Sequence, residues 1–303
     1  MSQAATTPLQ RDSAAGRRSA WQGAAGLILP YGVIAIFMAL SALFMAAPTV
    51  MLAVQSVTDD HGFTLKYLEA LSGDNIVIAF RNSIVLSVAS AAIGVVAGGL
   101  IAYFVLNPST PATVRSAVTS FSAVAANFAG VPLAFAFVST LGTLGMLTQG
   151  LRSVGVDIYG LGFSLFSMTG LTIVYSYFQI PLMVIIITPA LLALRTEWRE
   201  SSENLGATPG QYWRMIGLPV LAPSLISSFI LLFGSAFSAY ATAYALTSGN
   251  IALLTTEIAN VLSGDVSSSP QTGAALAVGM IVVMVGVLMI SAAFSRRASR
   301  WHK

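Results

Sequence analysis

The sequence predicts an all-α fold, a polytopic bundle of six transmembrane helices with both termini in the cytoplasm. Of the 303 residues, 56% are hydrophobic and only 8% are charged, whereas soluble domains carry about 25% charged residues. Six apolar runs are long enough to cross a bilayer, and the basic residues divide unevenly between the two sides. This composition excludes a soluble globular domain and a disordered chain.

Each apolar run reaches the length of about 18 residues that a membrane-spanning helix needs. The runs cover residues 26–50, 80–105, 119–141, 167–194, 221–246 and 272–294. The first run is too long for a signal-peptide core, and we expect the polar segment before it, residues 1–25, to be a flexible cytoplasmic tail. The transmembrane domain therefore covers 26–295, and residues 296–303 form a basic cytoplasmic tail.

The distribution of charge predicts the orientation. With the N-terminus inside, eleven of the fourteen Lys and Arg residues lie on the cytoplasmic side, which agrees with the positive-inside rule. The other three, Lys66, Arg81 and Arg152, lie outside with most of the acidic residues. No charged residue lies deep inside a span, which argues against an ion-coupled transporter that uses membrane carboxylates.

Several kinds of chemistry lack the residues that they need. There is no cysteine, and there are only two histidines, His61 and His302, so we expect no metal site. Neither lysine follows a glycine-rich phosphate loop, and the spans hold no residue pair typical of an intramembrane enzyme. We therefore expect no catalysis, no cofactor and no nucleic-acid partner. A secondary transporter and a non-transporting membrane scaffold remain alternatives.

The most informative segment is the charged cytoplasmic loop 195–219 between the fourth and fifth spans. Thr208 and Gln211 have the spacing of a capping box, with Pro209 at the first helical position. This pattern predicts a short helix from Pro209 to Gly217, which Pro219 ends.

Two further features describe this loop. Gly206 suits a left-handed turn between two helices, and Tyr212, Met215 and Ile216 have the spacing of one apolar helix face. Such a helix either lies on the lipid headgroups, as Trp198 and Trp213 allow, or docks into a groove on a cytoplasmic partner.

The spacing resembles the signature loop of the permease subunits of binding-protein-dependent ABC importers, Glu-Ala-Ala-x3-Gly-x9-Ile-x-Leu-Pro. Glu200-Ser201-Ser202 stands in place of Glu-Ala-Ala, and Gly206, Ile216 and Leu218-Pro219 follow at the same intervals. The two serines replace alanines, one small residue for another. The resemblance extends over roughly 75–295, where Phe80–Ser83 resembles the start of the permease core. Two further segments, Tyr175–Pro181 and Ala239–Gly249, resemble the polyamine-type subgroup.

The resemblance implies a type I ABC importer permease fold in a bacterial inner or plasma membrane. It implies a second permease subunit, identical or related, two ATPase subunits that bind ATP and Mg²⁺, and a periplasmic or lipid-anchored solute-binding protein, with membrane lipid around the spans. The outer loops, about 52–79 and 247–271, would receive the binding protein, and the turn-rich stretch 265–271 is a candidate for its docking. The implied substrate is a small solute, most closely a polyamine, with an aminophosphonate, thiamine or ferric ion as alternatives.

The resemblance also implies which loop residues couple this chain to the ATPase. They are Glu200, Ser201, Ser202, Gly206, Ala207, Thr208, Pro209, Tyr212, Met215, Ile216, Leu218 and Pro219. Glu200 would contact a basic side chain of the ATPase. The alternative for Glu200 is a solvated charge paired with Arg199 or Arg195.

Polar and aromatic residues of the fourth and fifth spans are candidates for the translocation path. They are Tyr175, Gln179, Ser235, Ser238, Tyr240 and Thr242. Aromatic faces would attract an organic cation, whereas the alternative for all six is helix packing. In the second span, the Gly94-x3-Gly98 pattern predicts close approach of another helix.

Overall fold

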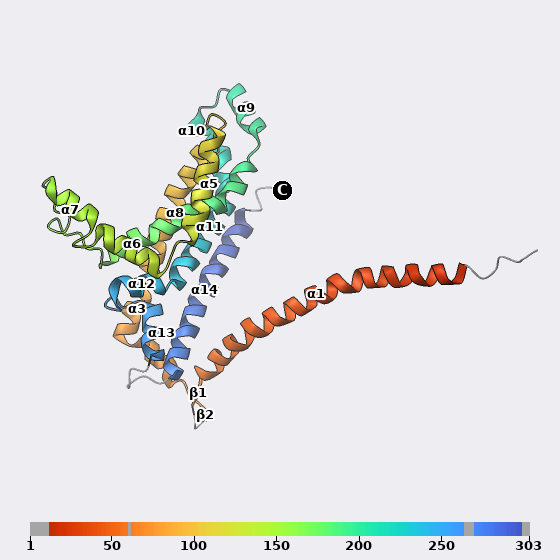
Figure 1. Ribbon diagram of the computed structural model, residues 1–303, viewed down its shortest axis with the longest axis horizontal. Coiled ribbons are helices and arrows are strands. Elements are labelled where there is room, and N and C mark those ends of the chain that lie inside the picture. Colours follow the sequence, from red (N-terminus) through yellow and green to blue (C-terminus); the bar gives the residue numbers. More distant parts are fainter. Residues whose placement is uncertain (1–11, 60–61, 264–269, 299–303) are drawn as a thin grey trace, which may run out of the picture. The chain divides into compact units, whose positions relative to one another are not determined.

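The computed structural model describes residues 12–59, 62–263 and 270–298, most of them in helices (Figure 1). The chain divides into two compact units, Met1–Gln55 and Ser56–Lys303. The only described element of the first unit is helix α1 (Asp12–Gln55). Because α1 begins at Asp12, residues 12–25 continue the helix of the first span, where the sequence predicted a flexible tail.

Six described helical segments are long and apolar enough to cross a membrane, as predicted. They are Tyr31–Gln55, Asp74–Val105, Val131–Ser153, Met168–Leu192, Pro209–Ser238 and Pro270–Ala293. The chain is thus a multi-pass membrane protein with an all-helical fold. The exception among the described residues is a ribbon of two short antiparallel strands, β1 (Thr58–Asp59) and β2 (Gly62–Phe63).

The second span begins after two single helical turns and contains a local widening. The elements in order are α2 (Lys66–Glu69), the 3-10 turn η1 (Ala70–Ser72), α3 (Asp74–Ile93), the π-helical segment η2 (Gly94–Gly98) and α4 (Gly99–Val105). A Cβ atom on Gly98 would lie 2.5 Å from the carbonyl oxygen of Ile180. The close helix approach predicted from Gly94 and Gly98 is therefore confirmed.

The third predicted span, 119–141, is wrong as a single helix. α5 (Ala112–Asn127) ends at a break, and α6 (Val131–Leu141) and α7 (Met146–Ser153) follow in a new direction (Figure 1). The break has a local cause, because Gly130 has φ +80° and Pro132 follows it. Glycine adopts this left-handed conformation without the steric cost that a side chain brings.

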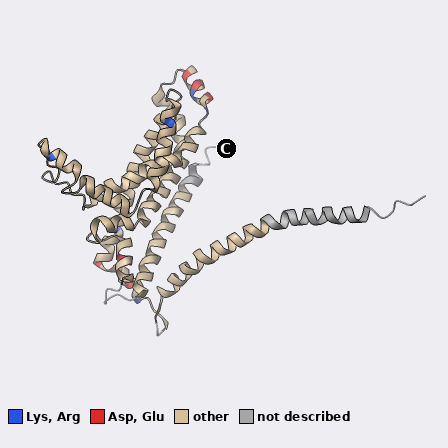
Figure 2. Cartoon of the chain, viewed as in Figure 1, with Lys and Arg blue, Asp and Glu red and all other residues tan. Residues whose placement is uncertain are grey.

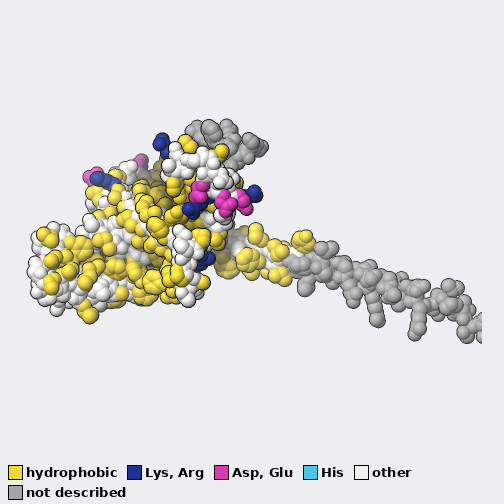
Figure 3. All heavy atoms as spheres, turned by 90° about the horizontal axis from the view of Figure 1, so that it is seen from above, with side chains coloured by type: hydrophobic (Ala, Val, Ile, Leu, Met, Phe, Trp, Pro, Cys, Tyr) yellow, Lys and Arg dark blue, Asp and Glu magenta, His cyan; other side chains and the backbone are white. Residues whose placement is uncertain are grey.

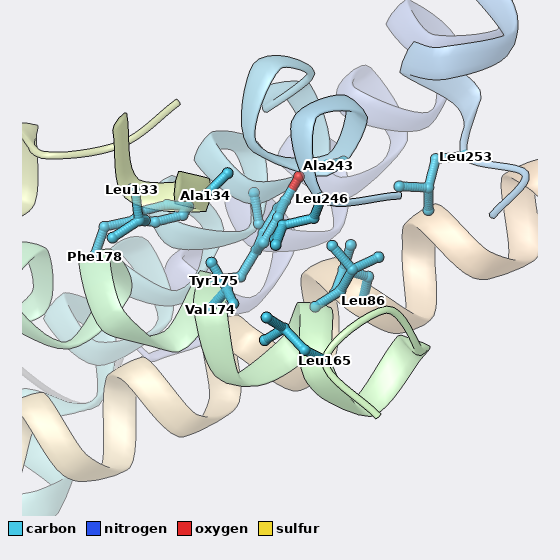
Figure 4. Packing of buried hydrophobic residues seen from close by; sticks show 12 residues of the cluster. Leu86, Leu133, Ala134, Leu165, Val174, Tyr175, Phe178, Ala243, Leu246 and Leu253 are labelled. Carbon is cyan, nitrogen blue, oxygen red and sulfur yellow. The ribbon is translucent and has the colours of Figure 1, made fainter. Parts of the chain in front are cut away.

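The centre of the second unit is α8 (Met168–Leu192), which packs against α3, η2, α4, α5 and α11. It is the most buried of the six spans, with 61% of its apolar window inside. Around it lies one hydrophobic cluster that includes Leu86, Tyr175 and Leu246 (Figure 4). A second cluster includes Met183, Leu232 and Phe233. These side chains join residues far apart in sequence into one bundle.

The fifth predicted span, 221–246, is also corrected. α11 (Leu218–Ser238) ends at Ser238, Ala239 is extended with ψ 104°, and α12 (Ala241–Thr247) starts again. The Tyr175 hydroxyl donates a 2.7 Å hydrogen bond to the carbonyl oxygen of Ala239. This bond satisfies a backbone acceptor that the helix end leaves without a helical partner.

The chain then completes the bundle with two more helices. α13 (Leu254–Leu262) packs on α3, and α14 (Pro270–Ala298) packs on α11 and α13. Most of the predicted docking stretch 265–271, and residues 299–303 of the basic tail, lie outside the described residues.

Candidate coupling site and translocation path

The charged loop predicted as the coupling site folds into two helices joined by a glycine turn. α9 (Thr196–Asn204) ends where the Gly206 N–H donates to the Glu203 carbonyl at 2.9 Å and the Ala207 N–H to the Ser202 carbonyl at 3.0 Å. These two bonds form a Schellman motif, in which the residue after the helix is left-handed. Gly206 has φ +79°, so the predicted turn is confirmed.

The next helix starts with the predicted capping box. In α10 (Pro209–Tyr212), the Gln211 N–H donates to the Thr208 hydroxyl at 3.4 Å, and the Thr208 N–H donates to Gln211 Oε1 at 2.7 Å. Both donors are among those that a helix N-terminus leaves without a backbone partner. The predicted start of the helix is therefore confirmed.

The predicted end of this helix at Pro219 is wrong. α10 passes through the π-helical segment η3 (Trp213–Gly217) directly into α11. The Leu218 N–H donates to the carbonyl of Trp213, five residues earlier. In a regular α-helix, the proline ring clashes with the carbonyl four residues before it. Here that carbonyl belongs to Met215, which lies in the wider π turn of η3. This turn leaves room for the ring of Pro219, so the helix continues into the bundle.

The same wide turn changes the helix face predicted from Tyr212, Met215 and Ile216. Tyr212 is only 7% exposed and Met215 is 73% exposed, so these two residues do not share one face. The prediction assumed 3.6 residues per turn, and a π turn has more. Tyr212 points inward and packs against Trp213, whose ring meets that of Tyr103 edge-on at 5.0 Å.

Glu200 lies on the exposed side of α9, where acidic and basic side chains gather (Figures 2 and 3). Both arginines considered as its partners interact elsewhere. The Nε of Arg199 lies 2.9 Å from Glu203 Oε1, and this hydrogen bond raises the pKa of Arg199. The Cζ of Arg195 lies 5.8 Å from the ring centre of Trp198.

The other predicted coupling residues divide by exposure. Ser202 is buried and its hydroxyl donates to the Arg199 carbonyl at 2.7 Å. Ala207 is half-buried. Ser201 and Ile216 line a cavity of about 410 Å³ between α9 and the start of α11. The exposed members of the set are Glu200, Ser201, Gly206, Thr208, Pro209, Met215, Leu218 and Pro219.

Three of the candidate path residues pack inside the bundle. Tyr175 and Gln179 are 0% exposed and Thr242 is 1% exposed. The Gln179 Nε2 donates to the Leu232 carbonyl at 2.8 Å, while its Oε1 is buried without a hydrogen-bond partner. The Tyr175 side chain points toward Ala243 and Leu246 (Figure 4).

The other three candidates lie at or near the break between α11 and α12. Ser238 is exposed and its hydroxyl donates to the Gly234 carbonyl of its own helix at 2.9 Å. Tyr240 is 36% exposed, and its ring lies 5.2 Å from that of Tyr244. Ser235 is half-buried. Because α11 ends at Ser238 and α12 begins at Ala241, the candidates Ser235 and Thr242 do not lie on one continuous helix.

Contacts that involve residues outside the predicted set hold the bundle together around these positions. The Gly130 N–H donates to the Thr242 hydroxyl at 2.8 Å and so joins the two helix breaks. The Ser83 hydroxyl accepts from the Leu254 N–H at 2.8 Å, and Asn82 Nδ2 donates to the Ala252 carbonyl at 3.0 Å. The Gly130-Val-Pro132 pattern was a signal for the break, whereas no local pattern pairs Ser83 with Leu254.

Within the described ranges, no three His, Cys, Asp or Glu side chains are grouped to hold a metal ion. Residues 94–300 match the family described as binding-protein-dependent transport system inner membrane component. This match covers more than half of the chain. The chain belongs to this family. The matched range contains the signature loop and both helix breaks, and it excludes α1 and α3.

Two relatives of this inner membrane component carry different substrates in their names. The trehalose transport system permease protein SugB of Mycobacterium tuberculosis is 27% identical over 42% of this chain and 46% of its own length. The spermidine/putrescine transport system permease protein PotC homolog of Mycoplasma genitalium is 29% identical over 39% of each chain. The chain thus spans about half the length, or less, of these curated relatives.

A solved structure supports the fold. A bacterial ABC transporter involved in the import of the acidic polysaccharide alginate contains a chain that matches with a TM-score of 0.71. The match covers 92% of this inner membrane component and 99% of that chain, at 19% sequence identity. At this identity the likeness is one of fold, and it extends over nearly the whole chain.

Proposed function

We propose that this chain is the permease subunit of an ABC importer, which passes a small solute from an external binding protein to the cytoplasm. ATP hydrolysis in a partner ATPase would drive transport, so this chain itself would not be an enzyme. The observation that carries the proposal is the α9–α10 loop, whose signature spacing coincides with a Gly206 turn and a capped helix. That loop also lies in the family range 94–300.

The geometry suggests how movement would pass from the ATPase to the spans. α10, η3 and α11 form one helical run from Pro209 to Ser238, so a push on the loop would move this run along its axis. The run ends at the break that carries Ser238 and Tyr240. We propose that Ser235, Ser238 and Tyr240 line the path there, whereas Tyr175, Gln179 and Thr242 hold the packing.

The proposed assembly contains a second permease subunit, identical or related, two ATPase subunits that hold ATP and Mg²⁺, and a solute-binding protein. The ATPases would dock on the α9–α10 loop, with Glu200 against a basic side chain. We propose a polyamine as substrate on the sequence resemblance. The alternatives are an aminophosphonate, thiamine or ferric ion, and the trehalose and alginate named for similar proteins.

Co-purification and uptake test this proposal. The tagged full chain, extracted from its native membrane in mild detergent, should bring down an ATPase subunit, and cells should take up radiolabelled spermidine or putrescine only with active ATPase. Glu200→Ala should reduce both readouts several-fold. Asp157→Ala, at an exposed acid between α7 and α8 and outside the two loops expected to receive the binding protein, is the matched control and should leave both unchanged.

Each contrary result points to a specific alternative. Uptake that survives loss of the ATPase and collapses with the ion gradient would identify a secondary transporter. Full ATPase association and uptake in Glu200→Ala would contradict the role proposed for the loop. Normal ATP-driven uptake of trehalose but not of polyamines would reject only the substrate.

A further inference from the structure

A second feature of the loop region is a cleft on another side of α9. It has a volume of about 260 Å³ and lies between the ends of α4 and α8, α9 and the α10–η3 run. The residues that line it are Tyr103, Leu106, Asn107, Pro108, Leu191, Leu192, Leu194, Arg195, Thr196, Arg199, Tyr212 and Trp213. None of these residues is acidic, so the charge of the lining is positive.

The positive charge comes from arginines that keep free donor capacity. Arg199 uses its Nε for Glu203, and a guanidinium has five N–H donors in all. Arg195 lies over the Trp198 ring, with no salt bridge to an acid of the described residues. Arg115 reaches the same region, because its Nη2 lies 3.4 Å from the carbonyl oxygen of Asn107, a lining residue. The Nε of Arg115 is buried without a partner.

The remaining lining suits an amphipathic ligand. Tyr103 and Trp213 meet edge-on beside the arginines, and four leucines cover another part of the cleft. The cleft lies where spans α4 and α8 end, which is the depth of the lipid headgroups, where tyrosine and tryptophan gather. A ligand held there would contact cationic and apolar groups together.

We infer that this cleft binds the headgroup of an anionic phospholipid. Arginine forms strong, directional hydrogen bonds with phosphate, and a basic pocket between spans at the membrane surface is suited to anionic lipid headgroups. A free phosphate ion would use the arginines but leave the leucines and aromatic rings without a role. The cleft therefore favours the lipid over the free ion.

The lipid would not compete with the proposed ATPase contact. Arg195, the residue just before α9, and Arg199 of α9 both line the cleft. Glu197, Glu200 and Asn204 follow a different stripe of the same helix and are all exposed. A headgroup in the cleft would join α9 to the ends of α4 and α8 and hold the coupling loop in position from behind.

Binding to the purified full chain in neutral detergent tests this inference. The probes are dioctanoylphosphatidylglycerol, which is anionic, dioctanoylphosphatidylcholine, which is zwitterionic, and inorganic phosphate. Tryptophan fluorescence reports occupancy, since Trp213 lines the cleft. We expect saturable binding of the phosphatidylglycerol, weakened about 10- to 30-fold in R195Q/R199Q. R214Q loses the same kind of charge from an exposed residue outside the lining, and should bind normally.

Two results would overturn the inference. The first is equal binding of both lipids in wild type and R195Q/R199Q. The second is displacement of phosphatidylglycerol by inorganic phosphate at equal concentration, which would assign the cleft to a free anion. If the double variant does not fold, as thermal melting would reveal, R195Q alone applies the same test with an expected loss of several-fold.

Discussion

At the residue scale, small residues decide how closely the spans pack. A Cβ atom on Gly98 would lie 2.5 Å from the Ile180 carbonyl oxygen and 2.7 Å from Met183 Cβ, so the second span and α8 would have to separate. At Gly99, one position along, the nearest atom is 3.9 Å away. Adjacent glycines therefore have different structural roles.

This difference gives a matched pair of variants. Gly98→Ala should lower the stability of the protein by about 1–3 kcal/mol, the usual cost of overpacking, because backbone and Cβ atoms of α8 lie in the way. Gly99→Ala should be neutral or slightly stabilising, since alanine favours a helix over glycine. Thermal unfolding of the two purified variants in detergent measures the effect, and equal melting temperatures would contradict the packing argument.

A single hydroxyl connects the two helix breaks. The Thr242 hydroxyl accepts from the Gly130 N–H, and its loss would leave a partly buried backbone donor without its partner. Thr242→Val should therefore cost about 1–3 kcal/mol.

Thr247 is the control for this change, because it is also buried in α12 but its hydroxyl donates to the Ala243 carbonyl of its own helix. Thr247→Val should cost clearly less than Thr242→Val in the same unfolding measurement. A larger loss in Thr247→Val would show that the link between the breaks does not contribute to stability.

At the element scale, the loop between α8 and α11 combines a stop signal and a start signal. Gly206 ends α9 in a Schellman motif and Thr208 begins α10 with a capping box. Each signal satisfies backbone groups at a helix end, so the turn has a defined geometry.

The capping box can be tested by hydrogen–deuterium exchange. Thr208→Ala should destabilise the start of α10 by about 1 kcal/mol, and amides of residues 208–212 should exchange several-fold faster. Thr208→Ser keeps the hydroxyl and should exchange at nearly the wild-type rate. Equal exchange in all three proteins would mean that packing of Tyr212, rather than the cap, holds this turn.

Backbone breaks inside apolar runs explain why two spans differ from their predicted bounds. The apolar runs 119–141 and 221–246 continue past the points where the backbone changes direction, at Gly130 and Ala239. Hydropathy reports how apolar a segment is and carries no information on its backbone dihedral angles. In the first case glycine and proline signalled the break, whereas in the second the stabilising contact comes from Tyr175, 64 residues away.

At the scale of the whole molecule, charge predicts the orientation of the chain in the membrane. The absence of cysteine from the sequence allows single cysteines to report it. Asn204→Cys in α9 and Glu69→Cys in α2 both replace exposed residues. The positive-inside rule places the first in the cytoplasm and the second outside.

A membrane-impermeant maleimide should therefore label Glu69→Cys in intact cells and Asn204→Cys only after permeabilisation. The unsubstituted chain should remain unlabelled in both conditions. Labelling with the opposite pattern would reverse the orientation and exclude ATPase docking on the α9–α10 loop from the cytoplasm.

The sequence alone predicted the features that depend on local chemistry. Low charge and six apolar runs predicted a multi-pass helical membrane protein, and the spacing around Gly206 and Thr208 predicted a turn and a cap that the structure confirms. These features depend on composition and on neighbours within about five residues. Their physical causes, desolvation of the backbone in lipid and the unpaired groups at helix ends, act locally.

Only the tertiary structure decided which side chains are buried and where the helices break. Tyr212 and Met215 have the spacing of one face, yet a π turn places one inside and the other outside. Tyr175 and Gln179 were candidates for the path, yet both lie in the core, where they bond to carbonyls of α11 and of the break after it. Such contacts join residues more than 50 positions apart, because burial and hydrogen-bond pairing depend on the whole packed bundle.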